Sequence, residues 1–404
     1  MRFPSFAVPA HVVTRRLRRM GWLLLIMVVI EFLDEFAYGT REAAWPLIRQ
    51  DLNLSYEQIG ILLAVPGLIA AFIEPFFGVW SNMGYRKLIM ILSGIVFGGM
   101  MMLAGLSSTF WMFLIFTTFE APGSGGMVGL AQTALMDSDP ERHEQNMARW
   151  TLAGSVGNLI APLLLGVSVA IGVSWRGQYL FIGLLIVIAA LVLTRVRIPA
   201  VNSDQDEEDD PRQFFTHFAD AFKALRQPGV TRSLVLLQFS DFMLDVLFGY
   251  LALYFVDVVG TDAALGGLAV TVWTGVGLFG DILIIPLLER MRGTTYLRIS
   301  AAATLILFPA FLLVPDVTAK LVLLGAMGFM NAGWYSILQA QVYTALPGQS
   351  GTALVLGTIF YAVGGLSPFM IGLVAGQAGL GAAMWIMLLG PIALLVGLPR
   401  RRAV

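Results

Sequence analysis

The sequence has no cysteine and only three histidines. The lack of cysteine excludes disulfides, thiolate metal sites and thiol catalysis. His11, His143 and His217 all lie in polar segments, so a proton pathway through an apolar region would have to use carboxylates. Charged residues make up only 13% of the 404 residues, which is too few for a soluble globular protein of this length.

What the sequence does contain is apolar. Hydrophobic residues make up 57% and the mean hydropathy is +0.79. A helix needs about 20 apolar residues to cross a bilayer. Twelve segments of suitable length are predicted to span a membrane: 21–44, 57–80, 86–106, 109–136, 147–172, 177–196, 232–256, 263–289, 294–314, 318–345, 351–376 and 380–399.

The basic stretch 15–19 ahead of the first segment is similar to the start of a signal peptide. The apolar run that follows is too long, carries acids at its centre and lacks a small-residue cleavage site. We therefore expect it to be an uncleaved first span of a multi-pass membrane protein.

One long polar stretch, 203–211, divides the twelve segments into six and six. It is acidic and predicted to be a solvated linker. The aromatic residues that follow recur at helical spacing, which predicts an amphipathic helix on the membrane surface. The predicted organisation is a basic N-terminus at 1–20, helical bundles at 21–199 and 232–399, the linker with its amphipathic helix at 200–231, and a basic tail at 400–404.

The basic residues are unevenly distributed between the two sides. If the N-terminus is cytoplasmic, 21 of the 25 Lys and Arg residues fall on that side, and only Arg41, Arg49, Arg176 and Lys320 fall on the other. The positive-inside rule then predicts that both termini are cytoplasmic.

The two halves resemble each other internally. Shifts of 206 or 207 residues superpose residues of the same kind and keep the order of the segments. The superposed pairs are Asp34 and Asp241, Gly60 and Gly267, Glu74 and Asp281, and Pro162 and Pro368. A parallel repeat of six helices predicts a transporter in which one half rocks against the other.

Twelve spans, a charged central linker and a basic turn after the second span resemble the major facilitator superfamily. Gly78, Asn82, Gly84, Arg86 and Lys87 form a variant of its turn, with Asn in place of Asp and one residue fewer. The stretch around Pro162 resembles a motif of exporters and antiporters. The stretch 45–60 is similar to drug and fosmidomycin resistance exporters. The resemblance implies an all-α membrane protein with N- and C-terminal six-helix halves.

Three acids lie in the middle of the first span. Glu31, Asp34 and Glu35 share one helical face at i, i+3 and i+4. A charge at this depth costs about 2.5–3.5 kcal/mol, so such residues usually face a polar cavity. The resemblance implies that spans one, four, seven and ten line that cavity. These spans would add further candidates for substrate or proton binding: Glu120, Asp241, Asp245, Asn331, Trp334 and Gln339.

We expect no Lys or Arg in the middle of the spans, so some of these acids should be protonated. A structural alternative is that each acid is held neutral by hydrogen bonds from a neighbouring helix. Asp34 is the strongest functional candidate because it repeats as Asp241. A second set, nearer the cytoplasmic ends or at helix-interrupting prolines, is assigned to gating or to helix packing: Glu74, Gly78, Asn82, Gly84, Arg86, Lys87, Asp281, Pro162 and Pro368.

The sequence therefore predicts a secondary transporter in a cell membrane, with a bacterial plasma or inner membrane favoured. The acids favour proton-coupled export of a small cationic or zwitterionic compound. An importer, a hard-cation transporter, and a membrane receptor or lipid-handling protein remain alternatives. No constellation indicates an enzyme, a cofactor, a metal site or nucleic-acid binding, and the chain is expected to act as a monomer.

Overall fold

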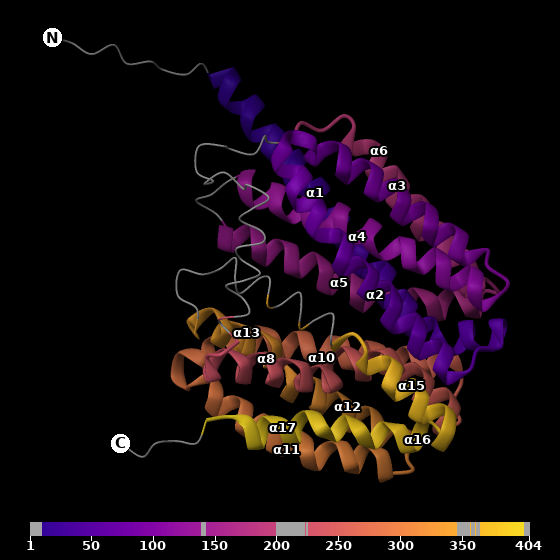
Figure 1. The fold of residues 1–404 in the computed structure, drawn as a ribbon. Coiled ribbons are helices and arrows are strands. Elements are labelled where there is room, and N and C mark those ends of the chain that lie inside the picture. Colours follow the sequence, from indigo (N-terminus) through magenta and orange to yellow (C-terminus); the bar gives the residue numbers. More distant parts are fainter. Residues whose placement is uncertain are drawn as a thin grey trace.

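The computed structural model describes residues 10–138, 143–198, 223, 225–345, 356, 360 and 364–399. Its regular elements are all helices within these ranges (Figure 1). Nine of the described helical segments are long and apolar enough to cross a membrane. Large apolar side chains such as Phe72, Trp111, Ile306 and Val396 are exposed on the helices, as expected for surfaces that contact lipid.

The first bundle consists of six long helices and a short π-helical turn. They are α1 (Ala10–Leu52), α2 (Tyr56–Trp80), η1 (Ser81–Tyr85), α3 (Arg86–Gly105), α4 (Phe110–Ser138), α5 (His143–Ala170) and α6 (Trp175–Leu193). Within it, α1 packs on α5 and α3 packs on both α4 and α6. The second helix begins at a capping box, in which Ser55 and Gln58 satisfy each other's backbone N–H groups.

The second bundle is more interrupted. It contains α8 (Pro228–Asp241), η3 (Phe242–Val246), α9 (Leu247–Leu253), η4 (Tyr254–Val258), α10 (Ala263–Arg290), α11 (Gly293–Leu313), α12 (Val317–Asn331), α13 (Trp334–Ala345), α15 (Ser367–Ala378), α16 (Leu380–Ala383), η5 (Met384–Leu388) and α17 (Leu389–Gly397). The first four run on as one predicted span with two π-helical turns.

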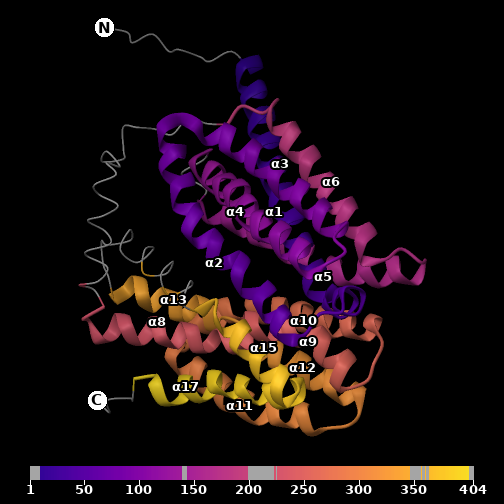
Figure 2. The same ribbon diagram turned by 45° about the vertical axis from the view of Figure 1, so that its right-hand side comes forward.

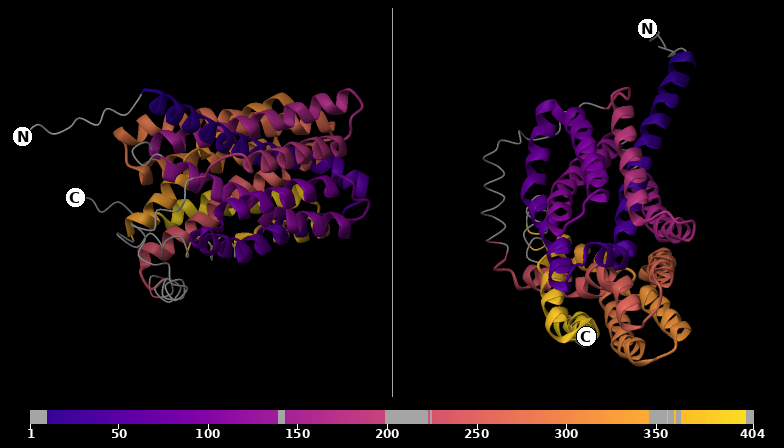
Figure 3. Two further views of the ribbon diagram at one scale, coloured as in Figure 1. Left: turned by 90° about the horizontal axis from the view of Figure 1, so that it is seen from above. Right: turned by 90° about the vertical axis from the view of Figure 1, so that its right-hand side faces the viewer.

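The two bundles lie side by side and touch at one end. Figures 1 and 2 show α1 to α6 on one side and α8 to α17 on the other, and the right-hand view of Figure 3 shows the same separation. The contacts between bundles run from α2 to α15, from α5 to α10 and from α1 to α9. In Figure 1 the bundles approach each other at the right, whereas both termini lie at the left. The molecule is therefore closed at the end away from its termini.

The structure corrects two details of the predicted spans. Helix α1 runs to Leu52, beyond the predicted end of the first span at 44, so Arg49 is also a helical residue. The tenth span breaks at Gly333, whose φ of 72° is left-handed and suits glycine. Of the predicted span 351–376, the residues 351–355, 357–359 and 361–363 fall outside the described part, as does most of the linker with its amphipathic helix.

Candidate functional site

The three acids of α1 reach different neighbours in the first bundle. Asp34 accepts a hydrogen bond from the Ser124 hydroxyl of α4 at 2.5 Å. Glu35 accepts one from the Asn158 amide of α5 at 3.1 Å. Glu31 is packed against Gly154 of α5, where a β-carbon would lie 2.6 Å from its Oε1 atom. Because Gly154 has no side chain, the Glu31 carboxylate can occupy this space.

Glu31 and Glu35 line a cavity of about 340 Å³ between α1, α4 and α5. Its other lining residues are polar or aromatic: Gln132, Trp150, Thr151, Gly154, Ser155 and Asn158. This lining suits a small cation. The two carboxylates attract its charge, the indole ring adds a cation–π contact, and hydroxyl and amide groups complete the polar surface.

Glu120 does not join the other acids as an unpaired carboxylate. It is 1% exposed and forms a salt bridge with Arg41 of α1. The expectation that the middle of the spans lacks a basic residue is therefore wrong. The sequence analysis placed Arg41 near the end of the span 21–44 and did not foresee that its side chain reaches Glu120 of α4. Burying either charge alone would be costly, so each requires the other.

The acids of the second bundle lie where α8 passes into a π-helical turn. Asp241 is the last residue of α8, and Asp245 lies within η3. The two carboxyl groups lie close enough to act electrostatically on each other. Asp245 is exposed to the space between the bundles and acts electrostatically on Glu35 of α1. The cross-bundle pair of acids is thus Glu35 and Asp245, whereas Asp34 turns towards α4.

The three candidates of the tenth span differ in burial: Asn331 and Trp334 are buried within the second bundle, whereas Gln339 is half-buried. The Asn331 side chain is 2% exposed, accepts a hydrogen bond from Thr304 at 2.8 Å and donates to the Met243 carbonyl at 3.4 Å. Trp334 is fully buried and donates to Ser300 at 2.8 Å. Both therefore hold the second bundle together. Gln339 is half-buried on α13.

Two predicted gating acids lie beside glycines. Glu74 of α2 packs directly against Gly125 of α4 and acts electrostatically on Asp34. Asp281 of α10 accepts a hydrogen bond from the Gly333 N–H at 3.2 Å, at the break between α12 and α13. Glu74 thus lies near the acids of α1, and Asp281 satisfies a backbone group that the interrupted helix leaves free.

The basic turn is anchored within the first bundle. Arg86 forms a 2.6 Å ion pair with Asp137 of α4, and Lys87 donates to the Thr194 and Val196 carbonyls at 2.8 Å. Gly84 has φ 91°, which turns the chain from η1 into α3. The two remaining members of the turn are Gly78, at which a β-carbon would meet no other residue, and Asn82, whose side chain falls outside the described part.

Residues that the repeat identified lie at contacts between the two bundles. A β-carbon on Gly60 of α2 would lie 3.0 Å from the Pro368 carbonyl oxygen of α15, and one on Gly267 of α10 would lie 3.6 Å from that of Pro162 on α5. The two prolines therefore lie at symmetry-related contacts between the bundles. Tyr250 of α9 also donates to the Pro368 carbonyl at 2.7 Å.

The closed end carries an ion pair that the sequence did not reveal. Arg49 of α1 donates to Asp257 of η4 at 2.9 Å, and the Tyr56 hydroxyl donates to the same carboxylate oxygen at 2.9 Å. The Arg49 guanidinium also lies 4.4 Å from the centre of the Tyr56 ring. These contacts join the two bundles at the end where Figure 1 shows them together.

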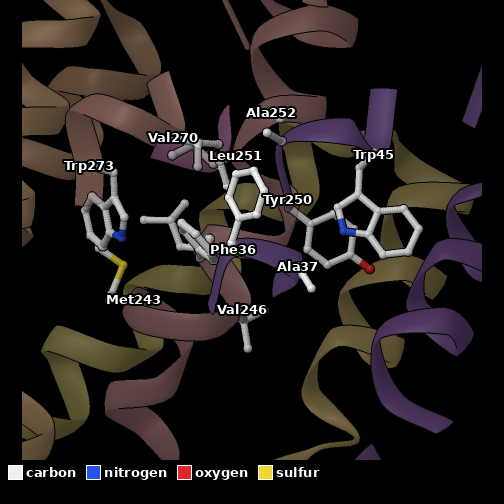
Figure 4. Close-up of a cluster of buried hydrophobic side chains, with 14 of the residues drawn as sticks. Phe36, Ala37, Trp45, Met243, Val246, Tyr250, Leu251, Ala252, Val270 and Trp273 are labelled. Carbon is white, nitrogen blue, oxygen red and sulfur yellow. The ribbon is translucent and has the colours of Figure 1, made fainter. Parts of the chain in front are cut away.

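Between this ion pair and the acids, the bundles meet in an apolar seam. Figure 4 shows Phe36, Ala37 and Trp45 of α1 close to residues of the second bundle, among them Val246 and Tyr250. The Tyr38 ring stacks on Phe248 with ring centroids 5.7 Å apart. One acid, Glu42, is buried in this seam at 2% exposure and accepts a hydrogen bond from the Trp45 indole at 3.1 Å.

Sequence reasoning overlooked Glu42, although the spacing offered a signal. It follows Glu35 by seven residues, which places the two on the same helical face. No group of three or more metal-ligating side chains converges in the described part of the chain.

The chain is similar to known transport proteins. It is 24% identical over 375 residues to a Haemophilus influenzae protein named "Putative metabolite transport protein", covering 89% of this chain and 90% of that one. It is 28% identical over 134 residues to a Na(+), Li(+), K(+)/H(+) antiporter of Planococcus maritimus, covering 33% and 31%.

Solved structures share the fold. A bacterial homolog of the human lysosomal transporter Spinster, in an inward-facing and unoccupied conformation, matches with TM-score 0.74 and 19% identity over 94% of this chain and 95% of that chain. The nucleoside transporter NupG matches with TM-score 0.75 and 14% identity over 93% and 97%. The sequence profile of the Major Facilitator Superfamily matches residues 24–368, most of the chain. The chain belongs to the Major Facilitator Superfamily and is a multi-pass membrane transporter.

Proposed function

We propose that this transporter exports a small organic cation or zwitterion in exchange for protons. The observation that carries the proposal is the excess of carboxylates in the middle of α1 and at the α8–η3 turn, of which Glu31 and Glu35 line the cavity. Arg41 is engaged by Glu120, so the other acids of this set have no ion-pair partner among the described residues: Glu31, Asp34, Glu35, Asp241 and Asp245. Such acids can bind either protons or a cation, but not both at once, which is the basis of exchange.

In this proposal Asp34 and Asp241 are the principal carboxylates for substrate and proton. Glu31 and Glu35 supply further negative charge, and Trp150 supplies an aromatic face at the cavity they line. Asp245 faces Glu35 from the second bundle, so that a bound cation between the bundles would meet acids from both. Glu74, Asp281 and the basic turn serve the gating movement.

We further propose that both termini are cytoplasmic. The positive-inside distribution of Lys and Arg supports this orientation. The closed end, with Arg49 and Asp257, then faces away from the cytoplasm, and the conformation is inward-facing. The protein would lie in a bacterial plasma membrane and act as a monomer.

The test is transport in proteoliposomes under an imposed pH gradient. Ethidium and tetraphenylphosphonium serve as organic cations, glycine betaine as a zwitterion, nicotinamide as a neutral compound and benzoate as an anion. We expect pH-driven movement of a cation or the zwitterion, with at least a tenfold loss in Asp34→Asn and in Asp241→Asn. Asp51→Asn, an acid near the closed end that pairs with Arg176, is the matched control and should transport normally. Undiminished exchange in both cavity variants, or transport of benzoate alone, would refute the proposal.

A second candidate is exchange of alkali cations for protons. The name of the Planococcus maritimus relative favours it, although the similarity covers 33% of this chain. Oxygen ligands such as those of Asp34, Ser124 and Asn158 suit hard cations. Uptake of radioactive sodium and rubidium in the same vesicles separates the two candidates, because organic-cation exchange would leave these ions outside.

A further inference from the structure

We propose that Glu42 is a proton site that couples closure of the seam between the bundles to proton uptake. The site is distinct from the acids at the cavity. The inference deepens the proposed proton coupling and rests on it in one respect only: the bundles must separate at this end during transport.

The first step of the argument is where Glu42 lies. Its carboxylate sits at the crossing of α1 with α9 of the other bundle, because a β-carbon on Gly249 would lie 3.3 Å from Oε2 of Glu42. The same β-carbon would lie 3.3 Å from the side chain of Leu63 on α2. The seam around it is apolar, as Figure 4 shows for the neighbouring Trp45 and Tyr250. Separation of the bundles would therefore expose Glu42 to water.

The second step is what surrounds the carboxylate. The charged groups that act on it are Arg41 on its own helix and Asp245 on η3, and Glu42 in turn acts electrostatically on Tyr179 of α6 and Tyr250 of α9. Arg41, the one cation among them, forms its ion pair with Glu120. Among the described residues no Lys, Arg or His forms an ion pair with Glu42. The closed seam thus leaves this acid without a cation of its own, and its hydrogen bond comes from the neutral Trp45 indole at 3.1 Å.

The third step is energetic. An ionised carboxylate without its own cation is costly to remove from water, whereas the neutral acid is tolerated when hydrogen-bonded. The closed seam therefore binds a proton at Glu42 more tightly than the open, hydrated seam does. By linkage, protonation favours closure to the same extent that closure favours protonation.

The path of the proton follows from the geometry. With the seam open, Glu42 takes up one proton at its carboxylate from the side away from the termini. With the seam closed, the proposed exit is on the side of Asp245, the exposed acid of the second bundle that acts electrostatically on Glu42. This order of events carries one proton inward for each return of the empty transporter.

The experiment follows the seam directly and needs no substrate. Because the native chain lacks cysteine, two spin labels can be attached at Gln50→Cys on α1 and Ala264→Cys on α10 without a background signal. Both positions are exposed near the closed end, one on each bundle. Distances are measured by double electron–electron resonance in full-length protein reconstituted in lipid nanodiscs between pH 5 and pH 9.

In the labelled parent, we expect the population with the longer distance, which is the open form, to increase as pH rises. For one coupled proton, the ratio of open to closed protein increases by up to about tenfold per pH unit. Glu42→Gln mimics the neutral acid and should stay closed at every pH. Glu42→Asp keeps an acid and should retain the response, as should the control Asp51→Asn. Thermal unfolding of each labelled protein verifies that it is folded.

Two results would overturn the proposal. One is a parent-like pH response in folded Glu42→Gln. The other is loss of the response in folded Glu42→Asp, which would indicate a structural role. The double variant Asp34→Asn/Asp241→Asn separates this inference from the proposed function. It should lose organic-cation exchange yet keep the pH response of the seam.

Discussion

Arg49 of α1 and Asp257 of η4 are separated by 208 positions in the sequence, yet their side chains lie 2.9 Å apart and join the two bundles. Asp257 sits in a π-helical turn, which shifts the register of the helix and is frequent at functional sites. Tyr56 donates to the same carboxylate. One carboxylate of the second bundle thus holds two side chains of the first.

Removing this carboxylate should favour opening of the closed end. Asp257→Asn leaves Arg49 without its ion pair. The two side chains are 31% and 19% exposed, so their ion pair is partly screened by solvent. We therefore expect the substitution to destabilise the closed form relative to the open form by only about 1 kcal/mol, which is roughly a fivefold shift in their ratio. The measurement is the spin-label distance between the bundles. The exchanged pair Arg49→Asp/Asp257→Arg should restore closure. If Asp257→Asn left the distances unchanged, the ion pair of Arg49 and Asp257 would not hold the closed end together.

The buried pair of Arg41 and Glu120 should contribute to folding rather than to substrate binding. Glu120→Gln leaves the Arg41 charge uncompensated, so we expect a loss of about 3–5 kcal/mol in the free energy of unfolding. The double variant Arg41→Gln/Glu120→Gln removes both charges and should recover most of the loss. Thermal unfolding in detergent provides the measurement, completed as a double-mutant cycle with Arg41→Gln. Additive losses in the cycle would show that the two charges do not depend on each other.

Nine of the twelve predicted spans coincide with described helical segments that are long and apolar enough to cross a membrane, because hydropathy over about 20 residues reports the membrane environment directly. The repeat matched Gly60 with Gly267 and Pro162 with Pro368 as equivalent positions, but it did not predict that α2 packs on α15 and α5 on α10. The predicted span 21–44 includes Arg41, but hydropathy does not report which distant residue a charged side chain pairs with, so the ion pair of Arg41 with Glu120 was missed.

Contacts between distant residues set the rest of the site. Asp257 and Glu42 were not among the predicted site residues, because each is a single acid near the end of an apolar run. The spacing of seven residues from Glu35 places Glu42 on the same helical face. The contacts that Glu42 and Asp257 make across the bundles depend on the packing of α1 against α9 and η4, which a single sequence does not encode in a local pattern. The acids of 31–35, in contrast, share a helical face and could be found from spacing alone.

Asn331 should be needed for stability and dispensable for substrate recognition. Asn331→Ala leaves the buried Thr304 hydroxyl without its acceptor and opens a void, so we expect a loss of about 1–3 kcal/mol. Gln339→Ala, at a half-buried position on α13, is the control and should cost less than 0.5 kcal/mol. Thermal unfolding measures the loss, and binding of the transported cation to the folded fraction tests recognition. A large change in affinity with unchanged stability would reverse this assignment.

Gly60 should be required for the closed end to form. A β-carbon there would lie 2.9 Å from Cα of Phe369 and 3.0 Å from the Pro368 carbonyl oxygen, and these backbone atoms cannot move aside without moving α15. Gly60→Ala should therefore push the bundles apart and raise the open population several-fold in the spin-label measurement. Gly67→Ala on the same helix meets no other residue within 4 Å and provides the control for helix propensity. Gly267→Ala, whose β-carbon would find ordinary contact at 3.6 Å, should close normally. If all three variants closed alike, the α2–α15 contact would not limit closure.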